Sequence, residues 1–372
     1  MKPYLVDVPV VLFVFVRPST LRCVFDRIKE ARPSQLFLVS DGPRPDKPED
    51  KELISESRKI VEEIDWDCCI HQYYQEENHG LYAMVRESLD WVFSYVDRCI
   101  FLEDDVVPSL SFFQFCSELL ERYKDDLRVN MICGMNHLGE YKEPNTDYFF
   151  SEAAAIWGFA FWRRTYEAFY DARYGEDPYI LDKMKEHAKG YKEFAKALEG
   201  YYRNEYYGGH MAGPEFYIRF VICSQNKVNI IPKYNMIKNI GFCEGSTHAA
   251  KDIRIMPKGV QNMFQMKTYE YTFPLKHPYY LIADSKYEKK VLRIVGRNNP
   301  LIRYYRRGEG LLRRLYYDRE KLFKQGSPIR GRSGLLLFTV LIILWGLFLF
   351  ILKSTFSKLM RVKTMNKERV NR

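Results

Sequence analysis

The sequence predicts an α/β fold with a largely parallel sheet. Short apolar segments alternate four times with segments of helical periodicity before residue 135, and polar residues follow the apolar segments. Continuous apolar strands that alternate with amphipathic helices are typical of a sheet covered by helices on both faces. The chain has 372 residues, 47% hydrophobic and 16% aromatic, which is ample material for one large core.

Each predicted strand ends in polar residues that could bind a ligand. In open parallel sheets, ligands bind beyond the carboxyl ends of the strands. Arg17, Asp41, Asn78 and the cluster Glu103-Asp104-Asp105 all fall at such ends. The expected strands are 8–15, 36–39, 69–73 and 98–102, and the expected helices are 21–31, 49–64, about 80–95 and 109–123.

The acidic cluster at 103–105 directly follows the apolar segment 99–102. Three carboxylates at the end of a buried strand repel one another unless a cation lies between them. Oxygen ligands of this kind suit Mg²⁺ or Mn²⁺, which leave coordination positions for substrate phosphates. The cluster therefore favours a metal-bound diphosphate, and the alternative is a solvated acidic turn.

Glycine-rich phosphate loops are missing from the expected places. The first strand is not followed by GxGxxG, and the sequence has no GxxxxGK[ST] motif. A Rossmann dehydrogenase and a P-loop nucleotidase are both disfavoured. A fold that holds a nucleotide through a metal fits better.

Six motifs occur in a fixed order along about residues 8–250. The motifs are VVLFVFVRP at 10–18, VSDGP at 39–43, NHGL at 78–81, FLEDD at 101–105, IWGFAFW at 156–162 and NIGF at 239–242, with Thr247-His248 behind it. This ordered set resembles the GT-A glycosyltransferases of the branch related to N-acetylglucosaminyltransferase I, especially bacterial cell-surface polysaccharide enzymes. The resemblance implies inverting transfer from a UDP- or GDP-sugar with Mn²⁺ or Mg²⁺.

The resemblance implies a role for each residue at the strand ends. Arg17 would meet the diphosphate or ribose, and Asp41 would hold the base or ribose. Asn78 and Gly80 would shape the nucleotide pocket. The roles at 103–105 would be sugar and ribose contacts for Glu103 and Asp104, and metal ligation for Asp105.

Simpler interpretations remain open for several of these residues. Arg17 could be a solvated loop cation, and Gly80 could only open the next helix. Asp41-Gly42-Pro43 is a good turn sequence without any ligand.

An inverting transfer also needs a base that deprotonates the acceptor hydroxyl. Glu215 is the candidate, because relatives carry an acid at the equivalent position, although this chain has Pro214 where they have Trp and Glu where they have Asp. Glu215 could instead complement a helix dipole. The competing acids are Asp171, Glu176 and Asp177.

Three further residues complete the expected site. His248 lies in a polar loop, and the resemblance suggests that it reaches the metal or the diphosphate. Its alternative is an exposed loop histidine. Trp157 and Gly158 would line the acceptor and donor-sugar pocket, and their alternative is a buried aromatic strand.

The expected domain organisation places a catalytic domain at 1–285, with a nucleotide-sugar half at 1–135 and an acceptor half at 136–285. A basic amphipathic, membrane-proximal segment follows at 286–333. Residues 334–352 are 19 uncharged residues, long enough for one transmembrane helix, and 353–372 form a basic tail. A buried core helix is the alternative for 334–352. Scattered cysteines and no signal peptide suit a cytosolic catalytic domain.

The net charge of +9 is concentrated around the apolar segment, so a membrane explains it better than a nucleic acid does. The greater density of Lys and Arg before 334 favours a single-pass protein of the bacterial inner membrane with a cytoplasmic catalytic domain. We expect a membrane-anchored glycosyltransferase that acts on a lipid-linked or membrane-proximal saccharide. The alternatives are a sugar nucleotidyltransferase and a non-catalytic membrane scaffold with the GT-A fold.

Overall fold

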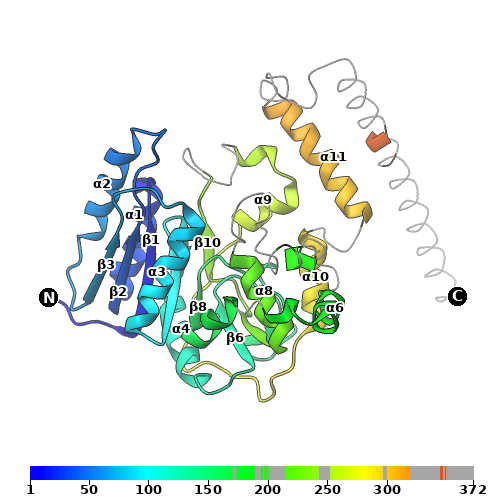
Figure 1. Ribbon diagram of the computed structural model, residues 1–372, viewed down its shortest axis with the longest axis horizontal. Helices are drawn as coiled ribbons and strands as arrows, with labels where there is room; N and C mark the ends of the chain where they lie inside the picture. Colours follow the sequence, from blue (N-terminus) through cyan, green and yellow to red (C-terminus); the bar gives the residue numbers. More distant parts are fainter. Residues whose placement is uncertain are drawn as a thin grey trace, which may run out of the picture. The chain divides into compact units, whose positions relative to one another are not determined.

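The computed structural model describes residues 1–170, 173–188, 194–195, 197–198, 200, 214–242, 252–295, 300–318, 344–346 and 348 (Figure 1). The chain divides into two compact units. The first comprises residues 1–251 and 262–298, and the second comprises residues 252–261 and 299–372.

The first unit is built on a mixed sheet of eight strands within the described residues, in the order β3-β2-β1-β4-β8-β6-β9-β7. A separate pair of strands, β5 and β10, is antiparallel. The bounds are β1 Val6–Val14, β2 Pro33–Ser40, β3 Cys69–Tyr74, β4 Arg98–Glu103, β5 Val106–Pro108, β6 Val129–Cys133, β7 Tyr148–Ser151, β8 Phe159–Trp162, β9 Val228–Pro232 and β10 Ile237–Asn239.

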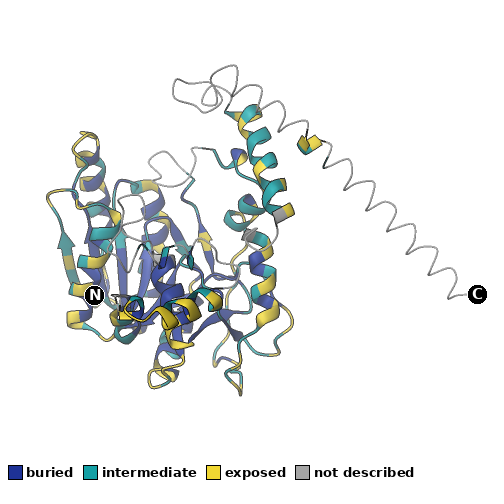
Figure 2. Ribbon diagram, turned by 45° about the vertical axis from the view of Figure 1, so that its right-hand side comes forward, coloured by how far each residue is buried: buried dark blue, intermediate teal, exposed yellow. Residues whose placement is uncertain are grey.

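The first four strands of the large sheet run parallel, as the sequence predicts. β1 pairs with β2 on one side and with β4 on the other, and β2 pairs with β3. The central residues of β1 and β2 are buried because helices cover both faces, which explains their uninterrupted apolar sequence (Figure 2). The predicted α/β class is therefore confirmed as a mixed sheet flanked by helices.

β8 converts the parallel half of the sheet into a mixed one. It pairs antiparallel with β4 and with β6, so it joins the two halves. Phe159 on β8 stacks on Phe101 of β4 with ring centroids 4.9 Å apart. Such neighbouring aromatic pairs stabilise a sheet through packing on one face.

Amphipathic helices connect and cover the strands. α3 packs Trp91 against Phe37 of β2 and Phe93 against Phe161 of β8. The bounds are α1 Pro18–Ala31, α2 Asp50–Val61, α3 Leu81–Tyr95, α4 Ser111–Arg122, α5 Arg163–Glu167, α6 Pro178–His187, α8 Pro214–Gln225, α9 Lys258–Phe264, α10 Ser285–Val295 and α11 Pro300–Tyr317, with 3₁₀ turns at Ala168–Tyr170, Arg173–Gly175 and Ile253–Ile255.

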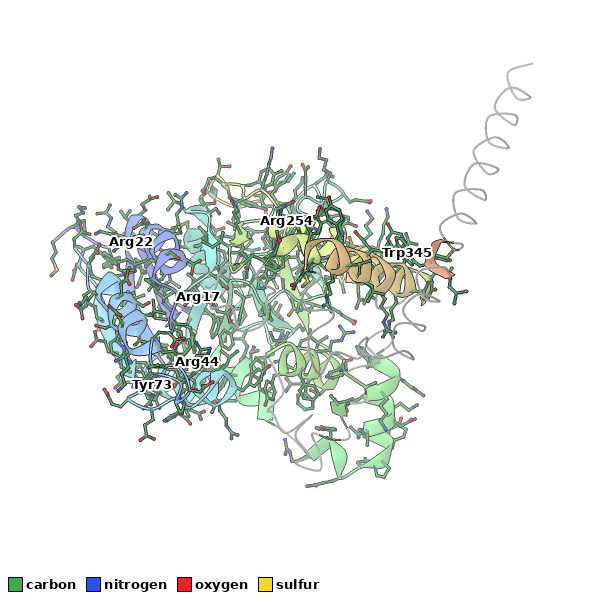
Figure 3. All side chains as sticks on the ribbon, turned by 90° about the horizontal axis from the view of Figure 1, so that it is seen from above. Arg17, Arg22, Arg44, Tyr73, Arg254 and Trp345 are labelled. Atoms are coloured by element: carbon green, nitrogen blue, oxygen red, sulfur yellow. The ribbon has the colours of Figure 1, made fainter. Side chains whose placement is uncertain are left out.

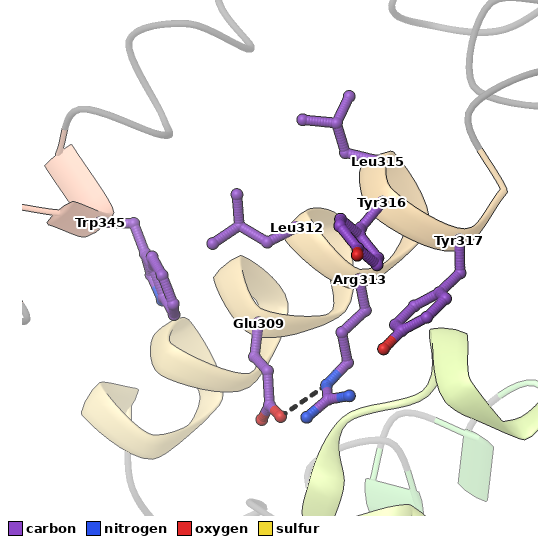
Figure 4. Close-up of a pocket in the computed structure, with 7 residues that line it drawn as sticks. All are labelled: Glu309, Leu312, Arg313, Leu315, Tyr316, Tyr317 and Trp345. Carbon is purple, nitrogen blue, oxygen red and sulfur yellow. Dashed lines mark hydrogen bonds and ion pairs between the residues drawn. The ribbon is translucent and has the colours of Figure 1, made fainter.

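The second unit contains α11, a helix with a basic and an apolar side. Glu309 accepts a hydrogen bond from the backbone N–H of Lys258 at 3.0 Å and pairs with Arg313 at 2.8 Å. Trp345 donates from its indole N–H to the carbonyl of Tyr305 at 3.1 Å. Beside this contact lies an open cavity lined by Glu309, Leu312, Arg313, Leu315, Tyr316, Tyr317 and Trp345 (Figure 4).

Among the described residues, no helix is long and apolar enough to cross a membrane. The predicted span at 334–352 lies outside those residues, apart from 344–346 and 348.

Candidate functional site

The candidate site lies where β1 and β4 meet at the centre of the sheet. The chain leaves β1 toward β2 and β3 on one side, and it returns to place β4 on the other side of β1. In doubly wound sheets, such a reversal of strand order opens a crevice at the carboxyl ends of the two strands. Arg17 follows β1, and Asp104 and Asp105 follow β4, so all three residues come to this point.

Arg17 bridges the two aspartates. Its Nη1 donates a hydrogen bond to Asp105 Oδ2 at 2.5 Å, and its Nη2 donates to Asp104 Oδ1 (Figure 3 labels Arg17). We call these three residues the Arg17 cluster. Asp104 is only 2% exposed and Asp105 is 8% exposed. The cluster therefore places two carboxylates and one guanidinium together, away from water.

Burial controls the protonation of Asp104. It raises the pKa of this carboxyl to about 6, because removal from water disfavours the charged form. The charge of Arg17 acts in the opposite direction, and the nearby Asp105 raises the pKa further. Asp104 thus titrates closer to neutral pH than an exposed aspartate does.

Two carboxylate oxygens of the cluster lack a hydrogen-bond partner within the described part of the chain. They are Asp104 Oδ2 and Asp105 Oδ1, and both are buried. An unpaired buried acceptor costs about 1–3 kcal/mol, so native proteins rarely leave one without a ligand. Hard anionic oxygens are the donor set that Mg²⁺ and Mn²⁺ prefer, and these two residues fit such a cation. No group of three or more His, Cys, Asp and Glu side chains assembles for a metal in the described residues.

The segment 239–242 forms one wall of the cluster. β10 pairs with β5, which places Asn239 opposite Val106, and the backbone N–H of Ile240 donates to the carbonyl of Asp105 at 2.9 Å. A Cβ atom on Gly241 would lie 2.1 Å from Asp105 Oδ2, so only glycine fits there. The NIGF motif therefore lies against the acidic cluster, although more than 130 residues separate the two in the sequence.

Asp41 ties two loops together at the carboxyl ends of β2 and β3. Its Oδ1 accepts from the backbone N–H groups of Gly42 and His79, and its Oδ2 accepts from Asn78 Nδ2 and the N–H of Gly80, all at 2.9–3.0 Å. A carboxylate has about four lone-pair positions. Protein donors thus use the acceptor capacity of Asp41, while its nucleotide contact stays a prediction.

Trp157 lies in an aromatic group beside the NIGF motif. Its ring centroid is 4.6 Å from that of Phe264, and Phe264 is 4.3 Å from Phe242. Gly158 has φ +60, and a Cβ there would lie 2.5 Å from Ile237 Cδ1, so glycine is required. Trp157, Phe242 and Phe264 are half-buried and present flat faces of the kind that pack on sugar C–H groups.

Phe264 was not predicted as a site residue. The residue is a single aromatic side chain in the polar helix α9, and nothing in its local sequence points to Trp157. Its proximity to Trp157 arises only from the tertiary fold. The spacing of apolar residues in the sequence does not predict this contact.

The structure leaves other predicted site residues untested. Glu215 lies at the start of α8, but its side chain is outside the described residues, as is the whole of His248. Glu103 ends β4 and is half-buried. Among the competing acids, Asp177 caps α6 by accepting from the N–H of Tyr179 at 2.9 Å, and Asp171 is outside the described residues.

Comparisons with known proteins are limited to weak structural likenesses. No protein-family model matches the sequence, and no curated protein matches it. A UDP-glucose pyrophosphorylase complexed with UDP-glucose aligns with a TM-score of 0.27 and 10% identity, covering 46% of this chain and 82% of that one. Mouse xyloside xylosyltransferase 1 in its apo form aligns with a TM-score of 0.33 and 10% identity, covering 60% and 84% respectively. These scores are too low to establish a shared fold.

Proposed function

We propose that this chain is a metal-dependent, inverting glycosyltransferase. It would move a sugar from a UDP- or GDP-sugar to a hydroxyl of a lipid-linked or membrane-proximal saccharide in surface polysaccharide assembly. The observation that carries the proposal is the Arg17 cluster, which lies between β1 and β4, where the order of the strands reverses. There, two buried carboxylate oxygens lack a partner in the described residues and fit a divalent cation.

The donor half of the site would bind the nucleotide-sugar through the strand ends. Asp105, with His248, would hold Mn²⁺ or Mg²⁺, and Arg17 would bind the diphosphate. A bound divalent cation supplies stabilisation of the negative charge that develops on the departing diphosphate. The loops joined by Asp41, Asn78 and Gly80 would shape the nucleotide pocket, while Glu103 and Asp104 would contact the sugar and ribose.

The acceptor half would position the attacking hydroxyl. Glu215 would accept its proton as the oxygen attacks C1 of the sugar, so that neither a free alkoxide nor a covalent intermediate is needed. Trp157 and Gly158 would form the sugar-facing wall. Phe242 and Phe264 extend the same aromatic group.

The remaining parts of the proposal concern the membrane. Residues 334–352 would anchor the chain in the bacterial inner membrane, with 286–333 at the membrane surface and the catalytic domain in the cytoplasm. Within the described part of that region, α11 carries exposed Arg307 and Arg314 together with exposed Leu301 and Tyr316, a composition that suits an interfacial helix.

Two other functions make different predictions. A sugar nucleotidyltransferase would release pyrophosphate from a nucleoside triphosphate, but the glycine-rich first loop usual in that class is missing here. A non-catalytic scaffold would bind neither metal nor nucleotide. The buried aspartates at 104 and 105 disfavour the scaffold. Incompletely paired charges in a core reduce stability, so a protein that binds no ligand there has no reason to retain them.

The test is thermal stabilisation of the purified protein by UDP and GDP, each with and without Mn²⁺. We expect a Mn²⁺-dependent rise in melting temperature with one of the two nucleotides, because a ligand that binds only the folded state stabilises it. Asp105→Ala should abolish this rise and all metal-dependent turnover. Full turnover in Asp105→Ala would remove Asp105 from the metal site, and no rise with either nucleotide in a folded protein would favour the scaffold.

A further inference from the structure

The Arg17 cluster has a charge imbalance. Asp104 and Asp105 together bring two negative charges when both are ionised, and Arg17 brings one positive charge. Arg17 occupies one oxygen of each carboxylate, and the other oxygen of each has no partner within the described residues. A single guanidinium therefore neutralises the pair only in part. The cluster retains binding capacity for a cation of higher charge.

The cluster is also closed to solvent in this state. Asp104 Oδ2 and Asp105 Oδ1 have essentially no exposed surface, and Asp105 Oδ2 accepts from Arg17 and lies so close to Gly241 that a Cβ atom there would be 2.1 Å away. A hydrated cation from solvent cannot reach either unpartnered oxygen without a movement of neighbouring atoms. The structure thus represents a conformation that must open before metal can bind.

Arg17 is the group best able to make that movement. The backbone at Asp105 is held by the N–H of Ile240 and by the β5–β10 pairing, so its displacement would break several hydrogen bonds. The Arg17 side chain is long and 17% exposed, and its two side-chain hydrogen bonds within the described residues both go to the aspartates. It also carries the positive charge that a divalent cation would replace.

We propose that Arg17 is an internal counter-ion that closes the metal site and exchanges with the divalent cation. A divalent cation held by Asp105, with Asp104 as a second oxygen ligand beside its expected ribose contact, would take the place of the guanidinium, which would leave at least one carboxylate and become available to the donor diphosphate. Arg17 thereby weakens the binding of the metal alone and strengthens the binding of the nucleotide when the metal is present. This inference rests on the proposed function and identifies how the binding of the metal and the binding of the nucleotide are coupled.

The exchange predicts opposite effects of one substitution on two ligands. Without Arg17, the metal no longer displaces a counter-ion, so Mn²⁺ alone should bind more tightly. Nucleoside diphosphate should bind less tightly in the presence of Mn²⁺, because its guanidinium partner is gone. Coupling free energies between two sites correspond to affinity changes of about 5- to 150-fold, and we expect about a tenfold change in each direction.

The experiment measures Mn²⁺ binding to the full-length protein by calorimetry and by electron paramagnetic resonance, with and without UDP or GDP. In Arg17→Gln, the Kd for Mn²⁺ alone should fall about tenfold, and the Kd for the diphosphate at saturating Mn²⁺ should rise about tenfold. Arg22→Gln is the matched control. It removes the same charge from α1, the helix that begins directly after Arg17; Arg22 pairs there with the exposed Glu63, and its substitution should leave both constants unchanged.

The outcomes separate this inference from the proposed function. Wild-type protein that binds Mn²⁺ as tightly as Arg17→Gln, or more tightly, would overturn the exchange while leaving a metal-dependent enzyme intact. Absence of Mn²⁺ binding in every protein with every nucleotide would contradict the proposed function itself. If Arg17→Gln does not fold, Arg17→Lys replaces it. A lysine keeps the charge but cannot bridge both carboxylates, so Mn²⁺ should again bind more tightly than in wild type, and unchanged or weaker binding would overturn the proposal.

Discussion

At the scale of single residues, the buried carboxylates of this protein differ in how fully they are hydrogen-bonded. The acceptor capacity of Asp41 is used by four protein donors, which join two loops. Asp104 and Asp105 each keep one buried oxygen without a partner in the described residues. Because an unsatisfied acceptor lowers stability, its retention is typical of a binding site. This difference is our reason for proposing the metal site at Asp104 and Asp105, while the nucleotide contact of Asp41 stays a prediction.

The saturation of Asp41 predicts a loss of stability on substitution. In Asp41→Asn, one carboxylate oxygen becomes an NH₂ group that faces N–H donors in either orientation of the amide. We expect the free energy of unfolding to fall by about 3 kcal/mol, measured by urea denaturation. Asp46→Asn in the neighbouring exposed loop should change it little, and a similarly small change for Asp41→Asn would show that the loops do not depend on this carboxylate.

Glu215 is predicted to act on the acceptor rather than on the donor. Glu215→Gln preserves size and removes the base, so transfer should fall by about 10²- to 10⁴-fold while the Kd for the nucleotide with Mn²⁺ stays unchanged. Steady-state transfer assays and calorimetry give the two quantities. The control is Glu176→Gln, which makes the same change at one of the competing acids. A loss of nucleotide binding in Glu215→Gln would assign Glu215 a structural role instead.

At the scale of elements, the loop between β2 and α2 is fixed to the helix by an ion pair. Arg44 donates to both oxygens of the buried Asp50 at 2.7–2.8 Å, and the backbone N–H of Arg44 donates to the same carboxylate. These side-chain hydrogen bonds are the main cause of a lowered pKa of Asp50, and burial opposes them. Asp50 also lies in the first turn of α2, where a negative charge is favourable.

The lowered pKa of Asp50 sets the pH range over which this element stabilises the protein. Its folded-state pKa lies below the ordinary value of 3.8, so the stabilisation is present above that value and is lost as the pH falls through the folded-state pKa. Asp50→Asn should therefore lower the free energy of unfolding by about 2 kcal/mol at pH 7. The difference from wild type should shrink at pH values below about 4. Urea denaturation across this range measures it, and a difference that does not change with pH would contradict the ionic origin.

Elements were predictable from the sequence where local pattern and burial agree. The strands β1, β2 and β4 are largely apolar segments because both faces of the sheet are covered, and the sequence placed their ends within about three residues. The acidic cluster was predictable for the same reason, since it ends such a strand. The pairing of Arg17 with both aspartates was not, because it depends on the order of strands in the sheet. The same holds for the contact of Trp157 with Phe264.

At the scale of the whole molecule, the chain combines a sheet-based unit with a basic, partly apolar C-terminal region. The first unit contains the Arg17 cluster, the loops joined by Asp41 and the aromatic group around Trp157. α10 begins at residue 285, the expected end of the catalytic domain, and it belongs to this first unit. For the region 299–372 we propose membrane attachment.

Two kinds of attachment can be separated by extraction from membranes. Surface charges bind anionic lipid only at low ionic strength, because salt screens exposed charges, whereas a spanning helix is released only when the bilayer dissolves. We expect the full-length chain to stay with the membrane fraction in high salt and to need detergent. A chain ending at residue 333 keeps the basic segment without the apolar one, and high salt should release it. Release of the full-length chain by salt alone would show that 334–352 does not span the bilayer, and it would leave the basic segment as the means of attachment.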